Sequence, residues 1–110
     1  MAVLQASDND FASILNSNQN VVVKYYADWC GNCRLFSPKF KRMSDDPQYD
    51  NITFVDVNAE TSPEARKMAG VTNLPYFAVF KNGTMVDSVA ASKEDAVISL
   101  IHKLQSTTQV

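Results

Sequence analysis

Apolar residues recur along the chain in two patterns that alternate from one end to the other. Short runs rich in β-branched and aromatic residues indicate strands, and the clearest is Val21-Val22-Val23-Lys24-Tyr25-Tyr26. Its nearly continuous apolar run is typical of a central strand covered on both faces. The last two strands flank Asn82-Gly83, a pair that accepts positive φ and so predicts a tight antiparallel hairpin. Strands are expected at 3–6, 21–26, 52–57, 76–80 and 85–89.

The segments between these strands carry apolar residues three and four positions apart, which is the spacing of amphipathic helices. Ser7 or Asp8 is placed to cap the first helix, and Ser92 is placed to cap the last one. The inward positions are Phe11, Ile14 and Leu15 in the first helix and Ala96, Val97, Leu100, Ile101 and Leu104 in the last.

Two further helices are expected in the middle of the chain. One runs from about Cys30 to Met43, with a kink at Pro38. The other runs from Pro63 to Met68, with Ser62 as its N-cap and Gly70 just past its end. The buried stripe of the longer helix is expected to be Leu35, Phe36, Phe40 and Met43. The order βαβαβαββα predicts an α/β fold, with a central mixed β-sheet flanked by helices on both faces.

The length and net charge of the chain limit the number of domains and the class of protein that it can be. The 110 residues, 45% of them apolar, suit one domain over residues 1–105 followed by a polar tail at 106–110. The net charge is -2 and the basic residues are scattered, so a nucleic-acid binder is not expected. No basic leader and no apolar run of membrane-spanning length is visible. If Met1 is the native start, we expect a cytoplasmic protein that does not enter a membrane.

The two cysteines are the residues most informative about chemistry. Trp29-Cys30-Gly31-Asn32-Cys33 directly follows the predicted central strand and opens a helix, where backbone N–H groups and the helix dipole favour an anion. C-x-x-C thiols at helix starts commonly have a pKa between about 3.5 and 7.5, well below the usual value of roughly 8.5. We therefore expect Cys30 to be the nucleophile. Cys33, one turn later, would resolve the mixed disulfide that Cys30 forms.

Other interpretations of the cysteine pair have less support. A structural zinc ion needs four Cys or His ligands, and the chain offers only His102 besides the pair, in the predicted last helix. A metal site is therefore not expected. His102 follows Ile101 in an amphipathic pattern and is expected to be a surface residue and not a catalytic base.

At this point the chain resembles the thioredoxin family, from about Val3 to Leu104. The resemblance rests on a redox motif, a helix-kinking proline, a cis-proline loop and a hairpin: Ala27 to Cys33, Pro38, Leu74-Pro75 and Phe80 to Gly83. It implies the thioredoxin fold, in which a cis-Pro75 faces the cysteine pair and the backbone of Leu74 pairs with an extended substrate.

The resemblance also implies a substrate-binding rim around Cys30. Its members would be Trp29, Gly70, Val71, Leu74 and Ala90. For Val71 and Leu74 the pattern leaves open whether they belong to this rim or to the core. Trp29, Gly31 and Asn32 would complete the redox motif.

Three residues depart from the family's usual pattern: Asn32 stands where a proline is usual, Lys24 where an aspartate is usual, and Ala90 where a glycine is common. On the neighbouring strand, Asp56 falls where many members carry a lysine. The chain thus holds the same two charges with their positions exchanged. Either Lys24 extends to solvent, or it pairs with Asp56, which would take the proton from Cys33 directly or through a water.

The resemblance implies a reductase of protein disulfides that uses the Cys30–Cys33 disulfide and no bound cofactor. Its partners would be a thioredoxin-reductase-type electron donor and disulfide-containing proteins, and we expect a monomer. Two alternatives stay open at this point. The same fold serves oxidants and disulfide isomerases, and it can also act as a binding module in which the thiols matter little.

Overall fold

The computed structural model describes residues 3–107, and its elements follow the predicted order. Strand and helix ends lie within a few residues of those expected, and a short 3-10 turn at Pro47–Tyr49 is an addition. The strands are β1 (Leu4–Ala6), β2 (Asn20–Tyr26), β3 (Thr53–Asn58), β4 (Tyr76–Lys81) and β5 (Thr84–Ala90). The helices are α1 (Phe11–Ser17), α2 (Gly31–Ser44), α3 (Pro63–Ala69) and α4 (Glu94–Ser106).

The five strands form one mixed sheet in the order β1-β3-β2-β4-β5. β1 and β2 run parallel to β3 on either side of it, whereas β4 is antiparallel to both β2 and β5. The hairpin is confirmed, because Asn82 and Gly83 have φ of 52° and 84° between β4 and β5. β2 is therefore the central strand, and the cysteine motif begins where it ends.

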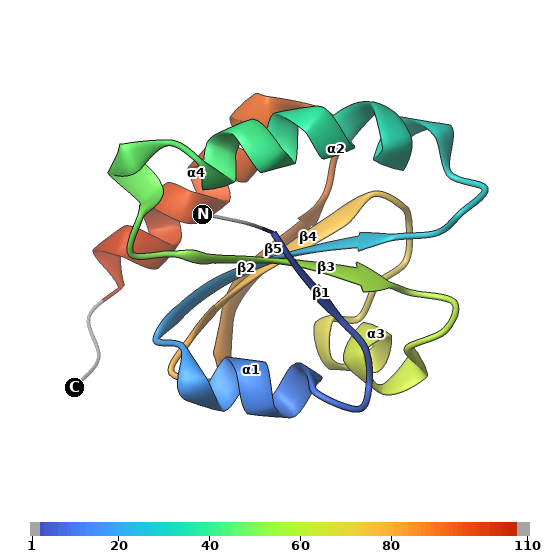
Figure 1. Ribbon diagram of the computed structural model, residues 1–110, viewed down its shortest axis with the longest axis horizontal. Helices are drawn as coiled ribbons and strands as arrows, with labels where there is room; N and C mark the ends of the chain where they lie inside the picture. The colour runs from blue at the N-terminus through green and yellow to red at the C-terminus, as the bar shows by residue number, and fades with distance from the viewer. Residues whose placement is uncertain (1–2, 108–110) are drawn as a thin grey trace.

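Helices cover both faces of the sheet, α1 and α3 on one side and α2 and α4 on the other (Figure 1). Successive residues of β2 alternate between the two layers, as the pleat of a strand requires. Val21, Val23 and Tyr25 pack in the cluster of α1 and α3, and Val22 packs in the cluster of α2 and α4. By the same alternation, Lys24 lies on the face that α2 covers.

The helix starts differ from the sequence-based expectation. Asp10, not Ser7 or Asp8, occupies the N-cap position of α1, and its side chain makes no capping bond. Asp8 instead reaches α3, where its carboxylate accepts hydrogen bonds from the backbone N–H groups of Glu64 (3.1 Å) and Ala65 (2.9 Å). Ser62 occupies the N-cap position of α3, but its hydroxyl forms no hydrogen bond within residues 3–107. The cap of α3 thus comes from a distant part of the chain.

Three other predictions were wrong. Lys93, not Ser92, is the N-cap residue of α4. Leu35 is 73% exposed, because it lies on the outer side of α2, whereas Phe36 and Phe40 are buried. Ser106, which we assigned to the tail, is the last residue of α4. Residues 108–110 of the predicted tail lie outside the described part of the chain. Gly70 lies just past the end of α3, as expected, and adopts a left-handed conformation with φ of 65°.

Over residues 3–107, none of the helices has the length and apolar character needed to cross a membrane.

Candidate active site

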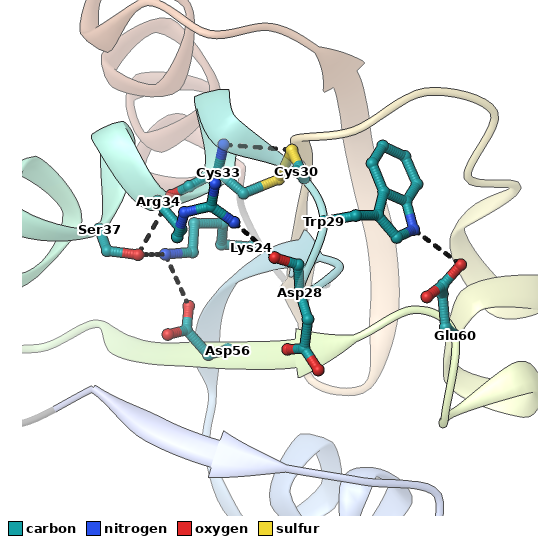
Figure 2. The surroundings of a disulfide bond; sticks show 9 residues. All are labelled: Lys24, Asp28, Trp29, Cys30, Cys33, Arg34, Ser37, Asp56 and Glu60. Carbon is teal, nitrogen blue, oxygen red and sulfur yellow. Dashed lines mark hydrogen bonds and ion pairs between the residues drawn. A yellow bond between two sulfur atoms is a disulfide. The ribbon is translucent and has the colours of Figure 1, made fainter.

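The cysteine pair lies at the start of α2, directly after the loop that follows β2. Cys30 is the N-cap residue, and its sulfur accepts the backbone N–H of Cys33 at 3.2 Å (Figure 2). The two residues form a disulfide, and their Cα atoms are 5.3 Å apart. Gly31 and Asn32, the first two residues of the helix, are exposed. The sulfur of Cys30 therefore faces the unpaired N–H groups of a helix start, which stabilise a negative charge there.

Trp29 stands beside the disulfide with its side chain largely in solvent. It is 66% exposed, and its indole N–H donates to the Glu60 carboxylate at 2.8 Å. Figure 2 shows the indole turned toward Glu60, in the loop between β3 and α3. This hydrogen bond fixes the orientation of an exposed aromatic surface next to Cys30.

A groove on one side of the cysteine pair brings together several predicted substrate-binding residues. The Leu74–Pro75 peptide bond is cis. Asn32, Leu74, Pro75 and Ala90 line this groove, which has a volume of about 220 Å³. Leu74 is half-buried and packs against the small apolar cluster that contains both cysteines. Asn73 also lines the groove, although the sequence patterns did not point to it.

The remaining two rim residues, Gly70 and Val71, lie in a separate hollow of about 550 Å³ that also includes Glu60. Val71 is only 8% exposed and belongs to the core cluster of α1 and α3, as the alternative interpretation allowed. Apart from Trp29, which lines neither of these hollows, the predicted rim is divided between one hollow beside Asn32 and Pro75 and another beside Glu60.

Lys24 and Asp56 meet beneath the cysteine pair. They are direct partners in the parallel register of β2 and β3, and both project toward α2. The Lys24 ammonium lies 3.3 Å from Oδ1 of Asp56. This contact is an ion pair and not a well-directed hydrogen bond, since Oδ1 accepts none within residues 3–107. The Lys24 side chain is 1% exposed and does not extend to solvent, whereas that of Asp56 is 22% exposed.

The other contacts of the Lys24 ammonium come from the helix and from aromatic rings. It donates to Oγ of Ser37 at 2.7 Å. It also lies 5.3 Å from the ring centroid of Phe40 and 5.9 Å from that of Tyr26. Figure 2 shows the lysine between Ser37 and Asp56, below the first turn of α2.

Burial shifts the ionisation of both members of the pair. Loss of water lowers the pKa of Lys24, and the charge of Asp56 counteracts part of that shift. Loss of water likewise raises the pKa of Asp56, against the opposing charge of Lys24. In both groups the dominant cause of the pKa shift is desolvation, and the charge of the partner opposes it, so each residue favours the charged form of the other.

A cavity of about 180 Å³ connects this pair to the redox centre, because Lys24, Asp56 and Cys33 all line it. Such a cavity is large enough to hold water molecules between polar groups. The arrangement places a carboxyl group with a raised pKa and the buried thiol position on the walls of one small space.

Two functional contacts were not predicted from the sequence. Glu60 has no local pattern that indicates a bond to Trp29, because the two are joined only by the fold. Ser37 had a usable signal, since it follows Cys33 by one helical turn.

His102 is exposed on α4, as expected. Among the described residues, no cluster of three or more His, Cys, Asp or Glu side chains is arranged to hold a metal ion.

Comparison with known proteins identifies the family. The sequence model of the family Thioredoxin matches residues 2–103. Thioredoxin 1 of Plasmodium falciparum is 31% identical over 94% of this chain and 97% of its own length. The chain belongs to the thioredoxin family. A solved structure of Plasmodium falciparum thioredoxin superposes with a TM-score of 0.83, at 31% identity over 92% of this chain and 98% of that one.

A second kind of relative is much longer. The peptide-N(4)-(N-acetyl-beta-glucosaminyl)asparagine amidase of Caenorhabditis briggsae is 37% identical over 91% of this chain, but the match covers only 16% of the amidase. Family membership and the Cys30–Cys33 disulfide together make this thioredoxin-family protein a thiol–disulfide oxidoreductase. The cysteine pair is its redox group.

Proposed function

We propose that this protein reduces disulfides of other proteins, with Cys30 as the attacking thiol and Cys33 as the resolving thiol. The observation that carries the proposal is the position of Cys30 as N-cap of α2, with its sulfur accepting the N–H of Cys33. In the reduced protein the same N–H stabilises a Cys30 thiolate, and the thiolate is the form that attacks.

The reduction takes place in two thiol–disulfide exchange steps. The Cys30 thiolate attacks one sulfur of a substrate disulfide, forms a mixed disulfide with it and releases the other sulfur as a thiolate. Cys33 loses its proton, attacks the Cys30 sulfur and releases the second substrate thiolate. The protein ends as the Cys30–Cys33 disulfide, and the substrate has gained two electrons.

Asp56 accepts the Cys33 proton in this proposal. Support comes from the shared cavity, where water can bridge the thiol and the carboxylate, and from the raised pKa of Asp56. Lys24 balances the charge of Asp56, so the carboxylate is ionised before the step and able to receive a proton.

Substrates bind along the groove formed by Asn32, Leu74, Pro75 and Ala90. The backbone of Leu74 pairs with an extended substrate segment, and Trp29 covers its flank. A dithiol reductase of the thioredoxin-reductase type restores the reduced form. This direction of electron flow suits a reducing compartment, and we place the protein, as a monomer, in the cytoplasm.

The two cysteine roles are tested by comparing Cys30→Ser with Cys33→Ser in an insulin-reduction assay and on non-reducing gels of cell extract. Both variants should lose turnover. Only Cys33→Ser should accumulate covalent complexes with substrates, because it retains the attacking thiol and lacks the resolving one. Equal accumulation in both variants would contradict the assignment.

A specific observation also favours a more oxidising use. Asn32 replaces the motif proline and is exposed beside the sulfurs, where its amide can donate to a thiolate and stabilise the reduced form. Redox titration against glutathione separates the two uses, since an oxidant has a higher reduction potential than a reductase.

A further inference from the structure

Ser37 connects the buried lysine to the resolving cysteine through two hydrogen bonds. Its hydroxyl oxygen accepts from the Lys24 ammonium at 2.7 Å. The same hydroxyl donates to the backbone carbonyl of Cys33 at 3.1 Å. Because the oxygen is occupied as an acceptor, the hydroxyl hydrogen is directed to the carbonyl, and the three groups form one chain.

This chain joins two elements that otherwise meet mainly through apolar contacts. Lys24 belongs to the central strand β2, and Ser37 belongs to the first turns of α2. The next residue, Pro38, has no N–H to offer the carbonyl four residues earlier, so the helix start is attached to the rest of α2 by fewer backbone bonds. The Ser37 hydroxyl bonds to the carbonyl of Cys33, which directly precedes the carbonyl of Arg34 that Pro38 leaves without its usual helical donor.

The Lys24 bond to Ser37 is of the stronger kind. It is charge-assisted and short, and its donor is buried. Among the described residues, the other polar partner of the ammonium is the carboxylate of Asp56, with which it forms an ion pair. If the hydroxyl is removed, the buried ammonium loses one of these two polar partners, and water in the cavity would have to take its place.

We propose that Ser37 is a positioning residue for the resolving step, which ties Cys33 to the Lys24 ammonium and holds the Cys33 thiol against the cavity shared with Asp56. This inference rests on the proposed role of Cys33 as the resolving thiol. The two side-chain hydrogen bonds of Ser37 go to the Lys24 ammonium and to the Cys33 backbone, and not to a sulfur. Its effect is confined to the second exchange step, because the first step takes place at Cys30, at the N-cap.

The side chains that line the cavity are the groups placed to influence the attack of Cys33 on the mixed disulfide. Besides Cys33 and Ser37, its walls include charged or titratable side chains from β2, the following loop, α2 and β3: Lys24, Tyr26, Asp28, Arg34 and Asp56. The Arg34 guanidinium donates to the backbone carbonyl of Asp28. Of these five side chains, Lys24 is the one that forms a hydrogen bond with Ser37 within residues 3–107, so the proposal predicts that the effect of Ser37 depends on Lys24.

Stopped-flow reaction of the reduced protein with 5,5′-dithiobis(2-nitrobenzoate) separates the two steps. Attack by Cys30 releases one thionitrobenzoate in a phase that depends on reagent concentration, and resolution by Cys33 releases a second in a phase that does not. Ser37→Ala should slow the second phase about fivefold, which corresponds to about 1 kcal/mol, the net value of one hydrogen bond. It should also move the pH midpoint of that phase and leave the first phase unchanged.

Three companion variants make the result specific. Ser37→Thr keeps the hydroxyl and should restore the wild-type rate and midpoint. Ser106→Ala removes a comparable serine that donates to a carbonyl of its own helix in α4, and it should change neither phase. In a Lys24→Met background, Ser37→Ala should produce no further slowing, because the chain is already broken.

The proposal is overturned if Ser37→Ala leaves the second phase unchanged across the pH range, or slows both phases equally, or is not rescued by Ser37→Thr. Failure of the proposed function gives a different result. If Cys33→Ser still releases the second thionitrobenzoate in a phase that does not depend on reagent concentration, then Cys33 does not resolve, whatever Ser37 does.

Discussion

Lys24→Met and Asp56→Asn each break the buried ion pair from one side, and the two substitutions should destabilise the protein in pH-dependent ways of opposite sign. Lys24→Met leaves a largely buried carboxylate without its counter-ion, and Asp56→Asn leaves a buried ammonium without its counter-ion and with its hydrogen bond to Ser37. The double variant removes both charges and serves as the reference.

The size of the effect follows from burial. Removing one member of a buried pair typically costs about 3–5 kcal/mol. Asp56 retains contact with solvent, which reduces the cost of leaving it unpaired, so we expect about 2–3 kcal/mol for Lys24→Met and about 3–4 kcal/mol for Asp56→Asn near pH 7. Since the residues are in contact, the loss in the double variant should be smaller than the sum by about 1–3 kcal/mol.

In Asp56→Asn, the titration of Lys24 sets the sign with which the free energy of unfolding changes with pH. Burial already lowers the pKa of Lys24 from 10.5, and the variant removes the negative charge that counteracts this shift. Between the lowered pKa and 10.5, the unfolded chain binds a proton that the folded protein does not bind. The free energy of unfolding therefore rises with pH in this window, and the deficit of Asp56→Asn should shrink between pH 7 and pH 10.

Lys24→Met should behave in the opposite way. Burial raises the pKa of Asp56 from 3.8, and the variant removes the positive charge that limits this rise. Between 3.8 and the raised pKa, the folded protein keeps a proton that the unfolded chain has released. Stability falls as pH rises through this window, so the deficit of Lys24→Met should be smallest near pH 4 and grow toward pH 7.

Urea denaturation of the oxidised proteins at several pH values measures all four free energies of unfolding. The double variant should show neither slope, because it lacks both titrating groups. Additive losses, or single variants with the same pH dependence as the double variant, would refute the reasoning that the two charges depend on one another.

Three further predictions concern other contacts. Asp8→Ala should destabilise the protein by about 1–2 kcal/mol through loss of the α3 cap, seen as a lower urea midpoint; Asp50→Ala, at an exposed residue away from that helix, is the control, and an equal loss there would contradict the capping role. Glu60→Ala should lower kcat/KM for insulin about two- to tenfold, because it releases the Trp29 side chain. The rate at which Cys30 attacks 5,5′-dithiobis(2-nitrobenzoate) should stay unchanged. Asn32→Pro should lower the reduction potential, with 30 mV corresponding to about 1.4 kcal/mol, and a rise or no change would show that the amide does not stabilise the thiolate.

Local patterns in the sequence determined the order of elements and the chemistry. The spacing of apolar residues distinguishes strands from helices, Asn82-Gly83 sets the hairpin, and C-x-x-C after a strand places two sulfurs at a helix start. These features depend on neighbours along the chain, so they can be derived without knowing what lies across the sheet. The outward position of Leu35 was mispredicted because apolar residues three and four apart can include one beyond the edge of the buried stripe.

Tertiary structure decided which distant groups meet. Asp8 caps α3 and Glu60 holds Trp29 because the fold brings loops together that are far apart in sequence. Lys24 and Asp56 were candidates for a pair, but only the parallel register of β2 and β3 aligns them, and the cover of α2 leaves the lysine side chain 1% exposed. The strength of a charge pair depends on the water that the rest of the molecule excludes. No local pattern encodes that burial, and it is what turns two ordinary charges into one dependent pair beneath the cysteines.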